Sequence, residues 1–263
     1  MTCEQASEQT FFGTSALLFA SCAVLTAAWS ESMSAMGAMP MPGGWEMSMT
    51  WMRMPGATWP GTAASFIGMW IVMMVAMMLP SLVPMLWRYR RGVVRTGGAR
   101  LGRLTTLVSL GYFFVWTLCG IAVFSLGSVL AYIEMQQASL ARAVPILAGA
   151  IVVIAGTIQF TAWKAHHLSS CRRSPASELT ISADGDAAWR QGVHFGLHCA
   201  NSCANLTVLL LVVGVMDLRA MVVVTVAITF ERLAPEGERV ARAIGIVIVA
   251  AGFVLIARAI GLA

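Results

Sequence analysis

The fold is decided by residues 63–87, AASFIGMWIVMMVAMMLPSLVPMLW, a stretch without a charged side chain. A helix needs about 20 consecutive apolar residues to cross the roughly 30 Å hydrocarbon layer of a bilayer. The apolar residues of this stretch follow one another without the period-two alternation that is typical of strands in a membrane barrel. The stretch therefore predicts a membrane-spanning α-helix.

Six further apolar segments predict further spans. They are residues 11–29, 104–132, 144–163, 192–216, 218–230 and 241–260, of which 218–230 is short for a span. The chain is 58% hydrophobic and 11% charged, whereas a soluble domain carries about 25% charged residues. Backbone polar groups in lipid have to pair within the chain. The sequence therefore predicts an all-α, polytopic transmembrane helical bundle of about seven spans.

The basic residues predict how the bundle is oriented. Three segments between predicted spans, 88–103, 164–190 and 231–242, hold thirteen of the seventeen basic residues. Basic loops favour the cytoplasmic side, so we predict a cytoplasmic N-terminus, with residues 30–60 and the C-terminus outside. We expect a multi-pass protein of a bacterial inner (plasma) membrane. The net charge of +5 is then a topology signal, and we predict no nucleic-acid partner.

The external segment is unusually rich in methionine. Residues 30–60 lack a helical period, and eight methionines lie within 33–54. Thioether sulfur is a soft ligand that suits Cu(I), so the segment can be a metal-collecting loop. The alternative is a gap-filling or membrane-skimming loop, because methionine is an adaptable apolar residue. We divide the chain into 1–62, the first span with this loop, and 63–263, a six-helix membrane domain.

The methionines continue into the span that residues 63–87 predict. Residues four apart share a helical face, and two such rows occur here, Met69, Met73 and Met77 in one and Met74 and Met78 in the other. Pro80 and Pro84 predict a kink in the cytoplasmic half of the helix. The candidate metal ligands on this span are Met73, Met74, Met77 and Met78. Packing or lipid-facing methionines are the alternative.

Residues 194–205, HFGLHCANSCAN, carry the most specific pattern. Polar residues inside a membrane are costly and usually face the bundle interior, and thiolates with imidazoles suit a soft metal. The candidate metal ligands are Cys199 and Cys203, an i, i+4 pair, with His198 and His194. At about 1.5 Å per residue, Met77 and Cys199 both lie roughly 15 Å from the cytoplasmic end. The alternative is that Cys and Asn pack and hydrogen-bond neighbouring helices.

Other chemistry is weaker in the sequence. A loop site at His166, His167 and Cys171 is conceivable, although we favour a solvated turn. We expect Glu231, at the end of the predicted span 218–230, to pair with Arg232 or another basic residue. The chain has no phosphate-binding glycine loop, nucleophile elbow or paired catalytic carboxylates, so we predict that it is not an enzyme. A haem oxidoreductase is disfavoured, because histidines at i, i+4 cannot ligate opposite faces of one haem.

Four stretches together resemble a family of bacterial membrane proteins known as domain of unknown function 2182. They are MWIVMMVAMMLPSLVPM (69–85), WKAHHLSSCRRSP (163–175), GLHCANSCANLTVLLLVVGVMDLRAM (196–221) and FERLAPEGERVARAIG (230–245). The similarity covers about residues 63–258 and implies a predicted metal-binding integral membrane protein. The family pattern has two adjacent Cys and a Trp where this chain has Ser202, Cys203 and Ala204. It also has Cys where this chain has His167, and Cys171 is kept.

The sequence thus predicts an integral membrane protein that binds, transports or delivers a soft metal, with copper expected. The external methionines would collect Cu(I), the methionines of 63–87 would relay it, and the residues of 194–203 would hold it. We expect the lipid bilayer, and a metallochaperone or cuproprotein, as partners. The alternative function is a structural or assembly subunit of a membrane complex, without a metal role.

Overall fold

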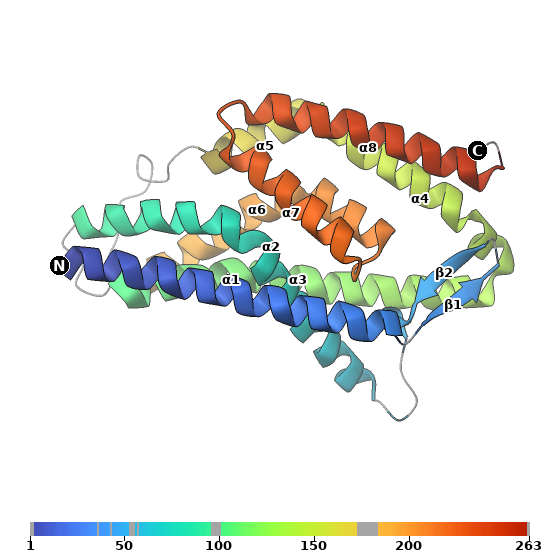
Figure 1. Cartoon of the computed structure of the whole chain (residues 1–263), viewed down its shortest axis with the longest axis horizontal. Coiled ribbons are helices and arrows are strands. Elements are labelled where there is room, and N and C mark those ends of the chain that lie inside the picture. Colours follow the sequence, from blue (N-terminus) through green and yellow to red (C-terminus); the bar gives the residue numbers. More distant parts are fainter. Residues whose placement is uncertain are drawn as a thin grey trace.

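The computed structural model describes residues 3–35, 37–42, 44–52, 56, 58–95, 101–172 and 184–261. Figure 1 shows long helices running roughly along one axis. Within these ranges, six helices are long and apolar enough to cross a membrane: α1 (Cys3–Ala35), α2 (Trp59–Arg95), α3 (Leu101–Gln136), α4 (Ala138–Ile158), α6 (Gly185–Val213) and α8 (Gly237–Ala259). Two shorter helices are α5 (Ala162–Arg172) and α7 (Leu218–Leu233). The predicted all-α polytopic bundle is confirmed.

Helix α7 is shorter than the six candidate spans but still reverses the chain. It has 16 residues, which at 1.5 Å each make about 24 Å, less than the hydrocarbon thickness of roughly 30 Å. Figure 1 shows α7 running back toward the end of the molecule where α6 begins. The start of α1, the end of α2, the start of α3, α5 and the α7–α8 connection lie toward one end of the molecule, and the end of α8 lies toward the other.

The segment 164–190, expected to be a basic connection between two spans, is helical at both ends, and its residues 173–183 lie outside the described residues. Its first part belongs to α5 and its last part to α6, which begins at Gly185. Lys164 is not solvated, because its side chain is 1% exposed. The fourth span also ends earlier than expected, at Ile158, because a turn at 159–161 separates α4 from α5.

The methionine-rich segment is partly ordered into a hairpin. Helix α1 continues to Ala35, six residues beyond the predicted end, and Ser30 donates a hydrogen bond to the Met216 carbonyl (2.6 Å). Strands β1 (Ala38–Met41) and β2 (Trp45–Ser48) then pair antiparallel, followed by a 3-10 helix, η1 (Met49–Trp51). The sequence analysis missed these strands. Met36 and Met54 lie outside the described residues.

Glycines bring two pairs of helices into close contact. In membranes, small residues let helix backbones approach one another. Between α3 and α6, a Cβ on Gly192 would lie 2.2 Å from the Val108 carbonyl oxygen, and one on Gly111 would lie 2.6 Å from the Trp189 carbonyl oxygen. Between α4 and α8, a Cβ on Gly252 would lie 2.9 Å from the Val153 nitrogen. Each pair therefore packs backbone against backbone.

Helix α2 lies beside α1 and α3 and carries most of its methionines into the core. Figure 1 shows that it changes direction part-way along its length. Pro80 and Pro84 lie inside this helix, and proline removes a backbone donor and clashes with the preceding turn. These two prolines explain the bend. Trp70, one of the largest buried side chains, donates its indole N–H to the Trp116 carbonyl (2.9 Å) and so fixes α2 against α3.

Candidate metal centre

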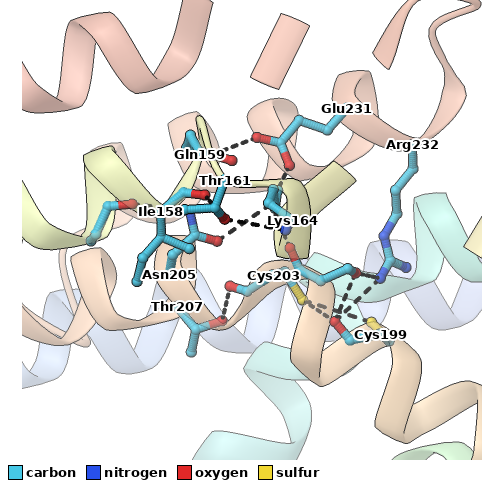
Figure 2. Close-up of polar contacts among 12 residues, drawn as sticks. Ile158, Gln159, Thr161, Lys164, Cys199, Cys203, Asn205, Thr207, Glu231 and Arg232 are labelled. Carbon is cyan, nitrogen blue, oxygen red and sulfur yellow. Dashed lines mark hydrogen bonds and ion pairs between the residues drawn. The ribbon is translucent and has the colours of Figure 1, made fainter. Parts of the chain in front are cut away.

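Three sulfur atoms from two helices meet in the core of the bundle. The Sγ of Cys199 on α6 lies 3.8 Å from the Sδ of Met78 on α2 and 3.8 Å from the Sγ of Cys203. All three side chains are buried. Figure 2 shows the two thiols on adjoining turns of α6, as their i, i+4 spacing requires. We call Cys199, Cys203 and Met78 the sulfur cluster.

A tyrosine on α3 closes the cluster on its third side. The Tyr112 hydroxyl lies 2.8 Å from the Cys199 Sγ, and the tyrosine is fully buried. This contact depends on Gly196, where an added Cβ would lie 2.9 Å from the Tyr112 carbonyl oxygen. The Cys203 thiol donates to the Cys199 carbonyl (2.7 Å), one turn back along the helix. The thiols are thus held by weak hydrogen bonds only.

The other candidate methionines of α2 are also in the core. Met73, Met74 and Met77 are buried, so the lipid-facing alternative for them is wrong. The expected meeting of sulfur from the two helices at one depth takes place at Met78, one residue beyond Met77. Successive residues of a helix are about 100° apart around its axis, so Met77 and Met78 point in different directions.

The two candidate histidines lie in a different group. His194 and His198 have their Nε2 atoms 3.1 Å apart, and the rings of His167 and His198 are 6.1 Å apart. His194 is exposed, whereas Cys199 is 1% exposed. One residue along a helix is a rotation of about 100°, so His198 and Cys199 point in different directions. The structure therefore separates the predicted ligands of α6 into a sulfur group and an imidazole group.

The favoured solvated turn at 166–171 is wrong. His166 and His167 lie on helix α5, and their rings contact one another at 5.6 Å. The His167 ring also contacts Trp163, with centroids 4.6 Å apart. The side chain of Cys171 lies outside the described part of the chain.

A buried ion pair lies on the other side of α6 and was missed. Lys164 Nζ is 2.8 Å from Glu231 Oε2, and the side chains are 1% and 2% exposed. Lys164 also donates to the Ser202 carbonyl and to Asn205 Oδ1 (3.3 Å), and Gln159 donates to Glu231 Oε1 (2.7 Å). Figure 2 shows Lys164 between Glu231 and Asn205. Glu231 thus has a basic partner, as expected, but the partner comes from the segment that had been expected to be a loop.

Arg232 links this pair to the turn that holds the thiols. Its guanidinium donates to Ser202 Oγ (2.7 Å) and to Ser81 Oγ on α2 (3.3 Å). It also approaches the Cys199 carbonyl at 3.4 Å. Figure 2 shows the guanidinium reaching toward the Cys199 turn. A fixed positive charge is therefore next to the sulfur cluster.

Several methionine side chains lie on one of the two faces of the hairpin. Met39 is directly opposite Met47, and Met41 is opposite Trp45. Opposed residues of an antiparallel pair, and residues two apart along a strand, point to the same face. Met47 is 2% exposed, and the Trp45 indole donates to the Ala141 carbonyl at the start of α4 (2.8 Å). This face therefore packs toward the bundle, and Met47 is not in a solvated loop.

The sulfur cluster suits a soft ion better than a hard one. Among the described residues, no group of three His, Cys, Asp or Glu side chains is already arranged to hold a metal. The cluster has two thiols, and its third donor is a thioether. Thiolate and thioether ligands select Cu(I). The donor set therefore fits copper, and the buried carboxylate of Glu231 is paired with Lys164.

The model of one protein family matches the chain over residues 67–255, and this family is PpoB2, described as a copper chaperone. No curated protein and no solved structure matches the chain. The match begins in α2 and ends in α8, so it contains the sulfur cluster and the ion pair. A copper-related family is thereby confirmed for the stretch that carries the resemblance, and membership of domain of unknown function 2182 stays a prediction.

Proposed function

Because the chain belongs to the PpoB2 family of copper chaperones, we propose that it holds Cu(I) as cargo on the sulfur cluster and delivers it to a cuproprotein or to another metallochaperone. The observation that carries the proposal is the meeting of Cys199, Cys203 and Met78 in the core. A metal–thiolate bond is about 2.3 Å long. Two sulfur atoms 3.8 Å apart then subtend an angle of about 110° at a shared ion, which is within the ordinary range for coordinated sulfur.

Charge balance supports the same site. Two thiolates and one Cu(I) carry a net negative charge, which is costly in a membrane unless it is paired. The Arg232 guanidinium next to the Cys199 turn offsets this charge. Lys164 separately neutralises the nearby carboxylate of Glu231.

The methionines suggest how the cargo reaches the cluster. We assign the hairpin face of Met39, Met41 and Met47 to copper collection, since thioethers bind Cu(I) without having to lose a proton. Met73, Met74 and Met77 in the buried part of α2 would relay it toward Met78. We propose that the protein lies in a bacterial inner membrane with a cytoplasmic N-terminus, because the end of α2, α5 and the start of α8, which carry basic residues, lie toward the end of the molecule where α1 starts.

The test is Cu(I) binding by the detergent-purified full chain in competition with a chromophoric Cu(I) chelator. We expect about one tightly bound Cu(I) in the wild type and its loss in the Cys199→Ser/Cys203→Ser variant. The matched control is Cys22→Ser, another buried cysteine, on α1, which should bind like the wild type. If the wild type and the double variant both fail to take up stoichiometric Cu(I), a structural subunit with packing thiols replaces the proposal.

A further inference from the structure

All four histidines of the chain gather where α5 packs against α6. His166 and His167 come from α5, and His194 and His198 come from α6. The rings form a continuous series of contacts, with centroids 5.6 Å apart for 166–167, 6.1 Å for 167–198 and 4.4 Å for 194–198. The packing of α5 against α6 therefore brings the imidazoles together.

The spacing of the two histidines on α6 is that of a helical metal-binding pair. Histidines at i, i+4 on one helical face bind zinc in metalloproteases. Here the two Nε2 atoms are 3.1 Å apart, so one ring donates a proton and the other accepts it. A metal ion between the same two nitrogens would replace that shared proton.

His167 supplies a third imidazole with a nitrogen that lacks a partner. Its Nδ1 is buried and has no hydrogen-bond partner in the described structure. Leaving a buried polar atom unpaired costs stability. The Trp163 ring lies next to the His167 ring, with centroids 4.6 Å apart. His166 is exposed next to it and can act as a fourth ligand from the solvent side.

We propose that these four histidines form a second metal site, separate from the sulfur cluster, for a divalent ion of intermediate softness such as Cu²⁺ or Zn²⁺. Imidazole suits these ions, whereas the thiols and thioether select Cu(I). The site lies at the exposed edge of α6, and the cluster lies in the core. Since no three of the described ligand side chains are already arranged around an ion, binding requires the rings of α5 to rotate toward His198.

The experiment uses the full chain carrying Cys199→Ser/Cys203→Ser, so that the thiols cannot contribute. Cu²⁺ is titrated and followed by electron paramagnetic resonance, and Zn²⁺ is titrated in a parallel sample. We expect one Cu²⁺ with hyperfine splitting from nitrogen. When His194→Gln and His198→Gln are added to this variant, the splitting from nitrogen should be lost. His167→Gln alone should weaken Cu²⁺ binding by at least about 10-fold, which is the effect of losing a group that only hydrogen-bonds a metal ligand.

A second measurement does not depend on the variants folding. In the protein with intact histidines, bound Zn²⁺ or Cu²⁺ should protect His167, His194 and His198 from acylation by diethyl pyrocarbonate, as read by mass spectrometry. Unchanged acylation, or equal Cu²⁺ binding with and without the imidazoles, would overturn the site. Cu(I) binding by the histidine variants with intact thiols reports on the sulfur cluster separately, so failure of one site is distinguishable from failure of the other.

Discussion

The two faces of helix α6 are buried alike and yet are chemically opposite. On one face Cys199 and Cys203 contact Met78 and Tyr112 through sulfur and a single hydroxyl. On the other, the Ser202 carbonyl and Asn205 accept hydrogen bonds from Lys164, whose charge is paired with Glu231. Lys164 and Glu231 thus find strong partners inside the chain, while the thiols find only weak ones.

This difference between the two faces separates groups that stabilise the fold from groups that can bind cargo. A buried ion pair that loses one partner leaves an uncompensated charge, so such a pair is structurally demanding. A buried thiol costs little to desolvate and behaves as a small apolar residue. Substitutions on the charged face should therefore affect folding first, and substitutions on the sulfur face should affect copper first.

The largest effect is expected from Glu231→Gln. The glutamine can keep the hydrogen bond from Gln159 but leaves Lys164 as a buried charge without a counter-ion. We expect a loss of about 3–5 kcal/mol in the free energy of unfolding, measured by thermal unfolding in detergent. The control is Glu236→Gln, whose exposed partner Arg239 should make the change nearly silent, since exposed pairs contribute little. Equal melting of the two variants would show that the charged face is not structural.

The next effect tests the contact that positions the sulfur face. Gly192→Ala would place a Cβ 2.2 Å from the Val108 carbonyl oxygen, so α3 and α6 have to separate. We expect a loss of about 1–3 kcal/mol, as for overpacking, together with weaker Cu(I) binding, because Tyr112 moves with α3. Gly68→Ala on α2 is the control, since its Cβ would meet nothing within 4 Å. Thermal unfolding and Cu(I) competition are measured on both variants. They decide whether the close contact between α3 and α6 affects both stability and Cu(I) affinity.

Met78→Leu separates binding from stability most directly. The two side chains are similar in volume, so stability should change by less than about 1.5 kcal/mol. Loss of the thioether next to Cys199 should nevertheless weaken Cu(I) binding by about 10-fold, or about 1.4 kcal/mol. The control is Met221→Leu on α7, which is also buried. If both variants keep wild-type affinity, the thioether is a packing residue and the cluster consists of the thiols alone.

Much of the fold could be predicted from the sequence because a bilayer imposes a simple rule on it. Long apolar runs have to become helices, and this rule located all six long helices. It could not show that residues 164–172 and 185–190 are helical, because their basic residues were taken to mark a loop, whereas Glu231 on α7 allows Lys164 to be buried. It also failed at 38–48, because two four-residue strands are too short to give a period.

The candidate site was only partly predictable for a related reason. Spacing along one helix identified the pair of Cys199 and Cys203, but which methionine faces it depends on how α2 is rotated about its axis against α6. Tyr112 and Arg232 could not be assigned, since their places depend on the close packing of α3 on α6 and on the short helix α7. Contacts between two helices cannot be predicted from the residue spacing within either helix.

The smallest expected effect comes from the hydroxyl group that closes the sulfur face. Tyr112→Phe removes a hydrogen bond to Cys199, and such bonds contribute about 1 kcal/mol. If the hydroxyl donates to the metal-bound sulfur, Cu(I) affinity should fall about five-fold, since 1.4 kcal/mol is tenfold. Tyr89→Phe is the matched control, because the Tyr89 hydroxyl is buried on α2 without a hydrogen-bond partner in the described structure. Its removal should leave affinity unchanged. A gain in affinity for Tyr112→Phe would mean that the hydroxyl blocks the cluster, and that Tyr112 has to move before copper enters.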